Sequence, residues 1–179
     1  MSLILETTGS RSEALARECA DVVMQAGKLM SKPDRKLVEY KSFYLFGFLS
    51  MGLMLLLVLC FILFWNGNTI MYVLLGALLV TTALLILTFV NYRKIYKTIL
   101  NMNEKVTQTF TSEGIEHNSD AGKCYKIGWS AIAFMRVLPH SLVFVPTERT
   151  GVAIFVERKH EEKVRDFLKE EKIPIKIVG

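Results

Sequence analysis

The sequence predicts an α+β membrane protein in which a transmembrane hairpin of two helices precedes a small antiparallel β domain that ends in a helix. Between Phe43 and Tyr92 there is no Asp, Glu, Lys, Arg or His, whereas both flanks are rich in charge. From about Lys105 onward, apolar and polar residues alternate, which is typical of strands. Residues 160–172 then have the apolar spacing of one amphipathic helix.

Residues 1–42 are expected to form a cytoplasmic amphipathic helix and a basic linker. Ser10 and Glu13 have the spacing of a capping box, the helical stretch runs to about Met30, and Pro33 ends it. Apolar residues spaced alternately by four and three form one face: Leu15, Cys19, Val22, Ala26 and Leu29. The helix can lie on the inner leaflet, on the C-terminal domain or on another subunit. The small residues of the face disfavour insertion into lipid.

Residues 43–92 are expected to form the transmembrane hairpin. Two uncharged runs, about 43–65 and 70–90, are each long enough as helices to cross a hydrocarbon core of about 30 Å. Asn66-Gly67-Asn68 between them is typical of a turn. The hydroxyls inside the runs are expected to bond back to the preceding helical turn, and they belong to Ser50, Thr81, Thr82 and Thr88. No ionisable residue lies in either run, which argues against a proton-coupled transporter.

The flanking charges predict the orientation. Basic residues stand on both outer sides of the hairpin, whereas the connecting turn has none; they are Lys32, Arg35, Lys36, Lys41, Arg93, Lys94 and Lys97. Cytoplasmic loops carry an excess of Lys and Arg, so both termini are expected in the cytoplasm. Aromatic residues near the expected boundaries suggest an interfacial belt of Tyr44, Trp65, Tyr92 and Tyr96. About forty mostly polar residues precede the first run, which disfavours a secretory signal peptide.

Residues 93–179 are expected to form the cytoplasmic domain. Its predicted strands cover residues 106–110, 123–129, 132–138, 141–145 and 152–156, with turns at 112–114 and 148–151. A helix over 160–172 follows, and the apolar residues 173–178 are predicted to add an edge strand. Antiparallel strands closed by one helix are typical of a small PH-like half-barrel, and other small α+β meanders share this periodicity.

A family resemblance adds to this prediction. The segment Thr109-Phe110-Thr111-Ser112-Glu113-Gly114-Ile115, then Trp129-Ser130-Ala131-Ile132, then residues 142–156 and a charged helix resemble the YcxB-like C-terminal domain of bacterial membrane proteins. In that family two transmembrane helices precede the domain, so the resemblance covers about residues 43–172 and implies a bacterial cytoplasmic membrane. Two features depart from the family pattern. Val156-Glu157-Arg158-Lys159 replaces a Pro-Lys-Arg-like element, and the N-terminal helix replaces a short strand.

The residues that commonly carry catalysis have no recognisable arrangement. His117, His140 and His160 lack metal-ligand spacing, and the glycines form no phosphate-binding fingerprint. Cys19, Cys60 and Cys124 are isolated, which indicates neither a zinc site nor disulfides. Trp129 is expected to anchor the domain core. We therefore expect no enzyme, no cofactor and no metal.

The leading hypothesis is a non-enzymatic accessory or scaffold protein that presents the PH-like module at the inner leaflet to a protein partner or a second copy. Anionic lipid or a partner is expected to contact the basic cluster of Arg93, Lys94, Lys97 and Lys105. The net charge of +5 is modest, so no nucleic acid is expected. The alternative is a ligand- or stress-triggered membrane effector whose hairpin oligomerises through small residues, namely Gly47, Gly76, Thr81 and Thr82.

Overall fold

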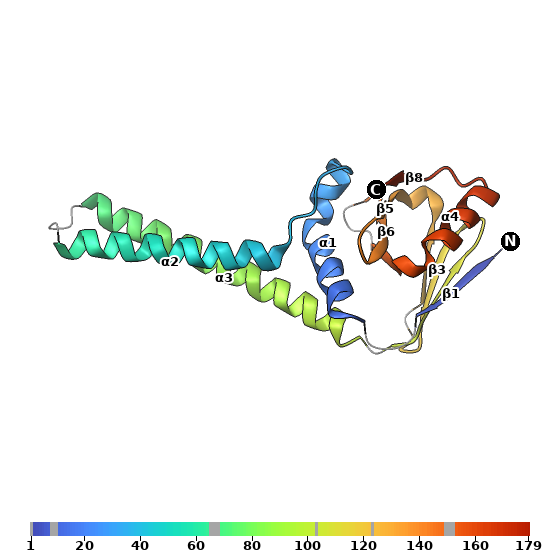
Figure 1. The fold of residues 1–179 in the computed structure, drawn as a ribbon, viewed down its shortest axis with the longest axis horizontal. Coiled ribbons are helices and arrows are strands. Elements are labelled where there is room, and N and C mark those ends of the chain that lie inside the picture. The colour runs from blue at the N-terminus through green and yellow to red at the C-terminus, as the bar shows by residue number, and fades with distance from the viewer. Residues whose placement is uncertain (1, 8–10, 65–68, 103, 123, 149–152) are drawn as a thin grey trace. The chain divides into compact units, whose positions relative to one another are not determined.

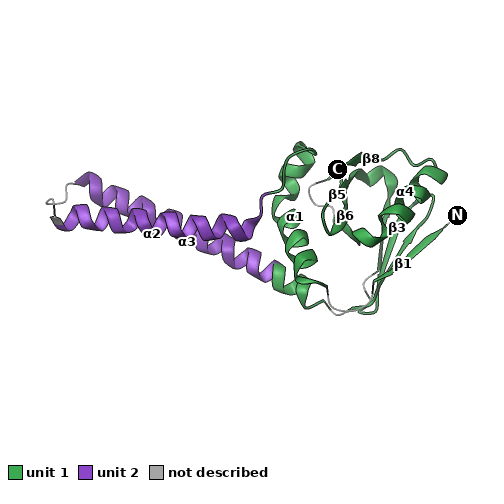
Figure 2. Cartoon of the chain, viewed as in Figure 1, with its two compact units in different colours: residues 1–37, 96–179 green, residues 38–95 purple. Residues whose placement is uncertain are grey.

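The computed structural model describes residues 2–7, 11–64, 69–102, 104–122, 124–148 and 153–179. It divides into unit 1, residues 1–37 with 96–179, and unit 2, residues 38–95 (Figure 2). The sequence placed residues 1–42 in a segment of their own, whereas the structure groups the first 37 with the C-terminal strands. The reason is that a strand and a helix from the N-terminus pack into the C-terminal fold.

Unit 2 contains two long apolar helices, α2 (Tyr40–Phe64) and most of α3 (Thr69–Leu100), drawn in Figure 1. Both are long and apolar enough to cross a membrane, and the most apolar stretch of each is not buried in the structure. The second apolar run was expected to end at Val90, but α3 continues to Leu100. Residues 91–100 contain neither Pro nor Gly, so nothing breaks the helix. The expected turn at Asn66-Gly67-Asn68 lies outside the described residues.

Tyr44 and Tyr92 pack inside the helix pair of unit 2. Their side chains are only 2% and 6% exposed, and their ring centroids are 5.7 Å apart. Phe89 completes the contact with its ring centroid 5.3 Å from that of Tyr44. The expectation that these two tyrosines form an interfacial belt is therefore wrong, because a belt residue faces lipid head groups. Trp65, a third member of that belt, lies outside the described residues.

The predicted hydroxyl bonds of the apolar helices are confirmed. Ser50 donates to the carbonyl of Gly47, Thr82 to that of Leu78 and Thr88 to that of Leu85, at 2.7–3.0 Å. Thr81 likewise donates to the carbonyls of Ala77 and Leu78, each at 3.0 Å. These groups are satisfied within their own helices, which is what an apolar environment requires.

Unit 1 contains two four-stranded sheets (Figure 1). The first is antiparallel, in the order β1 (Leu3–Thr7), β2 (Val106–Phe110), β3 (Gly114–Ser119) and β4 (Cys124–Gly128). The second has the order β7 (Ile154–Glu157), β6 (Ser141–Pro146), β5 (Ile132–Val137) and β8 (Lys176–Val178). Only β8 pairs in parallel, with β5, among these strands. The predicted strands are present, although β4 and β5 end one residue before the predicted Trp129 and Leu138 and β8 begins only at Lys176. Lys123 and residues 149–152 lie outside the described residues.

Strands β1 and β3 were not predicted. Strand β1 pairs with β2 so that Leu3 faces Phe110 and Thr7 faces Val106. The sequence predicted only a helix in this N-terminal region, whereas the chain has the strand β1 as well as the helix α1. Five residues are too few to show a reliable alternation of apolar and polar side chains. The partner strand, β2, begins about a hundred residues later. Leu5 of β1 is nevertheless buried in the core.

Helix α1 (Glu13–Ser31) packs on the second sheet. Ser12 is its N-cap, with its hydroxyl accepting from the amide of Leu15 at 3.2 Å, whereas the Ser10 predicted for that role lies outside the described residues. The predicted apolar face is buried except for the half-buried Ala26. Val22 and Leu29 share a cluster with residues of β5 and β6, namely Phe134, Val143 and Val145. Of the three positions considered for this helix, the structure shows packing on the C-terminal strands.

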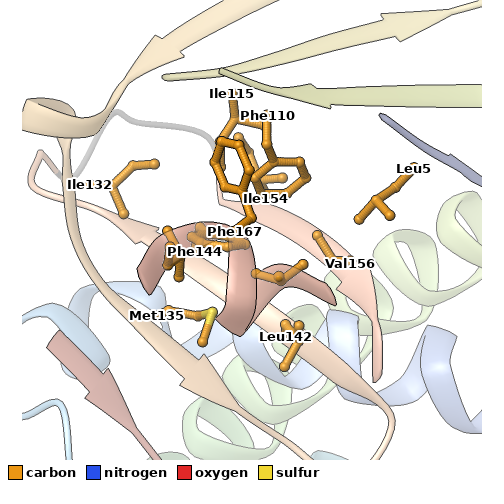
Figure 3. Close-up of a cluster of buried hydrophobic side chains, with 12 residues drawn as sticks. Leu5, Phe110, Ile115, Ile132, Met135, Leu142, Phe144, Ile154, Val156 and Phe167 are labelled. Atoms are coloured by element: carbon orange, nitrogen blue, oxygen red, sulfur yellow. The ribbon is translucent and has the colours of Figure 1, made fainter. Parts of the chain in front are cut away.

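The main core of unit 1 lies beneath α4 (Glu161–Glu170) and is drawn in Figure 3. Phe167 of α4 points toward Phe110 and Phe144, which come from different sheets. The 3-10 turn η1 (Trp129–Ala131) leads into β5, and η2 (Arg158–His160) leads into α4. The indole N–H of Trp129 donates to the Thr111 carbonyl at 2.9 Å beside this core, which confirms its predicted role as an anchor.

Candidate functional site

The structure separates the predicted basic cluster into two parts. Arg93, Lys94 and Lys97 are exposed on the last turns of α3, and their spacing of three and four residues places them on one helix face. No ion pair among the described residues involves them. Lys105 lies beyond the end of α3, and its ammonium is 3.2 Å from a carboxylate oxygen of Glu6 in β1. Only the first three residues therefore present uncompensated charge on one surface.

The three histidines lie in different environments of unit 1. His117 stacks on Tyr125 with ring centroids 4.5 Å apart. The backbone N–H of His140 donates to the Glu18 carboxylate at 3.0 Å. Burial lowers the pKa of His160, and the charge of Lys159 lowers it further. Across the residues that the structure describes, no group of three or more His, Cys, Asp or Glu is placed to hold a metal ion.

A cavity of about 420 Å³ lies in unit 1. Helix α1 forms one wall with Val22, Val23, Ala26, Leu29 and Met30. The end of α3, the residues just after it and strands from both sheets form the rest. The sequence did not reveal this cavity, because its walls come from many separate segments and no single segment carries a motif for it.

Five polar residues line the same cavity: Arg11, Glu104, Gln108, His117 and Tyr125. The Gln108 amide donates to the Phe155 carbonyl at 2.9 Å, and Glu104 accepts from the Ser119 hydroxyl at 2.5 Å. Burial raises the pKa of Tyr125, and the nearby charge of Arg11 acts in the opposite direction. No hydrogen bond or ion pair between described residues involves Arg11. The cavity thus combines apolar walls with one uncompensated guanidinium.

The described strands leave four sheet edges, at β1 and β4 in the first sheet and at β7 and β8 in the second. Strand β4 carries exposed Cys124 and Lys126. The Lys126 ammonium is 2.7 Å from Glu113 and 3.2 Å from Glu116. Charged side chains on an edge strand discourage unspecific pairing with other chains. An edge of this kind accepts a further strand only from a partner that fits its side chains.

Comparison of the chain with protein-family models, with curated proteins and with solved structures finds no match. The resemblance to the YcxB-like domain therefore stays a prediction, carried by the motifs quoted above.

Proposed function

We propose that this chain is a non-enzymatic accessory or scaffold protein of the bacterial cytoplasmic membrane, and that its PH-like, YcxB-like domain binds a partner at the inner leaflet. In this proposal α2 and α3 span the bilayer as a hairpin and both termini are cytoplasmic. The observation that carries it is the uncovered apolar surface of unit 2, whereas unit 1 has a closed core of its own.

The large apolar surface of the hairpin supports a membrane-spanning role. Leu45, Leu49 and Leu63 are 69%, 71% and 77% exposed, and similar residues continue along both helices. Soluble monomers rarely expose contiguous apolar patches of more than a few hundred Å². Lipid would remove this surface from water, and the basic residues on the last turns of α3 favour the cytoplasmic side.

The proposed partner is a protein or a second copy of this chain that adds a strand at an edge of unit 1 or packs on α4. Strand addition supplies main-chain hydrogen bonds, and alternate side chains supply specificity. Anionic lipid head groups are proposed to contact the basic residues at the membrane surface, and nucleic acid is not a proposed partner.

Labelling with a charged maleimide that does not cross membranes tests the topology. Exposed Cys124 is expected to react in inverted membrane vesicles and to stay unlabelled in intact cells. Cys19 is buried and Cys60 lies inside an apolar helix, so Cys124→Ser should remove the signal. Labelling of Cys124 from outside intact cells, or a full-length chain that is soluble without detergent, would contradict the proposal.

Site-specific photo-crosslinking tests the partner. A photoreactive amino acid at Lys126 of β4 or Lys169 of α4 is expected to give a discrete crosslinked band in cells, and the same residue at Arg17 of α1 serves as control. Mass spectrometry of the band then identifies the partner or a second copy. A full-length chain that purifies in mild detergent only as a monomer, with no crosslinked product from either site, would contradict a scaffold role.

A second candidate is a ligand- or stress-triggered effector whose hairpins oligomerise in the membrane. Gly76 of α3 favours it, because a side-chain carbon built there meets no atom within 4 Å. Gly47 does not favour oligomerisation, because a Cβ atom at Gly47 would lie 3.3 Å from a methyl carbon of Leu85 in the same hairpin. Thr81 and Thr82 bond to their own helix. Expression under stress should then collapse the membrane potential, and Gly76→Leu should prevent this. A potential that stays intact under all conditions rejects this candidate.

A further inference from the structure

We propose that the cavity of unit 1 binds one long-chain fatty acid, with the carboxylate at Arg11 and the alkyl chain between α1 and the strands. A scaffold or an anchor does not need such a ligand, so this site goes beyond the function proposed above. Its support comes from the volume, the apolar walls and the charge of the cavity.

The volume suits a single alkyl chain. Ligand sites in proteins have volumes of about 300–1,000 Å³, and this cavity has about 420 Å³. A methylene group is similar in size to a water molecule, which occupies about 30 Å³ in the liquid, so the cavity has room for roughly 14 such groups. That is enough for one chain of a medium-length to long fatty acid, and too little for the two chains of a phospholipid.

The walls are apolar where the chain would lie. Val23 of α1 is 41% exposed although it is a large apolar residue, and it lines the cavity. Met30 of α1 and Ile99 of α3 line it as well. An alkyl chain in the cavity would remove this surface from water, which is the main driving force for binding an apolar ligand.

The charge of the cavity selects an anionic head group. Glu104 is the only carboxylate among the described residues of the wall, and it already accepts the hydroxyl of Ser119. The Arg11 guanidinium has no carboxylate partner among the described residues, and a guanidinium pairs with a carboxylate through two parallel hydrogen bonds. Tyr125 lines the cavity as well, and its protonated hydroxyl is able to donate a further bond.

The test uses the full-length chain in phosphatidylcholine nanodiscs and radiolabelled tetradecanoate, with empty nanodiscs subtracted. We expect saturable binding of about one molecule per chain. Tetradecanol has the same chain without the charge and should bind about tenfold more weakly, which corresponds to about 1.4 kcal/mol. Arg11→Gln should weaken tetradecanoate binding about tenfold and leave tetradecanol unchanged. Arg17→Gln makes the same change at an exposed site of α1 outside the cavity and should have no effect.

A second pair of variants tests the location of the chain. Val23→Trp places an indole at the half-exposed edge of the cavity and should abolish binding of both ligands, whereas Ala14→Trp on the exposed side of α1 should not. Circular dichroism shows whether each variant is folded. If Val23→Trp does not fold, the effect of Arg11→Gln on tetradecanoate binding still tests the proposal. Binding no greater than in empty nanodiscs, or equal binding of acid and alcohol, overturns the proposal.

Nanodiscs of phosphatidylglycerol test whether the anionic alkyl chain in the cavity belongs to a membrane phospholipid and not to a free fatty acid. Tetradecanoate binding should be the same in these discs as in phosphatidylcholine. Loss of binding there would mean that a membrane phospholipid occupies the cavity, which also overturns the proposal. The topology and crosslinking experiments do not depend on a ligand, so failure of this inference can be told apart from failure of the scaffold function.

Discussion

The Glu18 carboxylate in α1 accepts a hydrogen bond of 2.5 Å from the hydroxyl of Ser141 at the start of β6. These two residues are 123 positions apart in the sequence. A second bond joins the same carboxylate to the backbone N–H of His140 at 3.0 Å. Ser141 is fully buried, so its hydroxyl depends on this carboxylate for a partner. This contact attaches the N-terminal helix to the C-terminal strands.

Glu18→Ala is expected to lower the free energy of unfolding of unit 1 by about 1–3 kcal/mol, because the buried Ser141 hydroxyl loses its partner. Denaturant unfolding of the full-length chain, followed by circular dichroism, measures the change. Glu13→Ala is the control, since its ion pair with Arg17 is exposed and its loss should cost less than about 0.5 kcal/mol. Equal effects of the two variants would show that the Glu18 contact contributes no more than a surface pair.

The thiol of Cys19 is expected to make stability depend on alkaline pH. Burial raises its pKa from an ordinary value of 9.0 to about 12. Below pH 9 the thiol is protonated in both the folded and the unfolded chain, so it has no effect. Above pH 9 only the unfolded chain releases the proton, and the free energy of unfolding falls by about 1.4 kcal/mol per pH unit until about pH 12.

Cys19→Ala should remove this part of the pH dependence, because no thiol is left to ionise. Denaturant unfolding of both proteins between pH 8 and about pH 11 gives the two slopes, and Tyr and Lys residues contribute equally to each. The prediction is wrong if the two curves of stability against pH are parallel.

Two glycines of unit 1 should respond to alanine in opposite directions. A Cβ at Gly114 would lie 2.2 Å from the Ile127 carbonyl oxygen, so β3 and β4 would have to move apart. We expect Gly114→Ala to destabilise by about 2 kcal/mol or more. A Cβ at Gly27 in α1 meets nothing within 4 Å, and Gly27→Ala should stabilise by about 0.5–1 kcal/mol. Thermal unfolding measures both, and a neutral Gly114→Ala would contradict the close approach of the strands.

The exposed basic face at the end of α3 is expected to recruit anionic lipid. Replacing Arg93, Lys94 and Lys97 by Glu should weaken enrichment of phosphatidylglycerol around the reconstituted chain by about 1 kcal/mol per residue, and added salt should reduce the difference. Energy transfer to a labelled lipid measures the enrichment. Lys105→Glu should have a smaller effect because Lys105 is paired with Glu6, and Lys169→Glu on α4 is the control. Unchanged enrichment in the triple variant rejects the lipid contact.

Features encoded by neighbouring residues could be predicted from the sequence. The stretch from Phe43 to Tyr92 contains no charge, and the structure has two apolar helices there. The local pattern predicted β2 and β4 to β7 but not β3, and the apolar residues of α4 are buried as expected from their spacing. Of the proposed site residues, Arg93, Lys94 and Lys97 share one helix face, which helical periodicity also implies.

Contacts between distant residues could not be predicted in this way. Leu3–Thr7 is a strand only because β2 supplies hydrogen-bond partners about a hundred residues later. The prediction that Tyr44 and Tyr92 form an interfacial belt was wrong, because the spacing of residues along one helix does not show which side chains of another helix their rings contact. The cavity around Arg11 exists only once helix and strands are assembled.

The sequence by itself determined which segments are apolar helices, where most of the C-terminal strands lie and which residues each can bury, since those properties depend on periodicity within a few turns or pleats. Only the tertiary structure decided that β1 completes a sheet, that β8 runs parallel to β5 and that α1 lies on the second sheet. These choices depend on the free energy of pairing surfaces far apart in the chain, for which no local pattern is a guide.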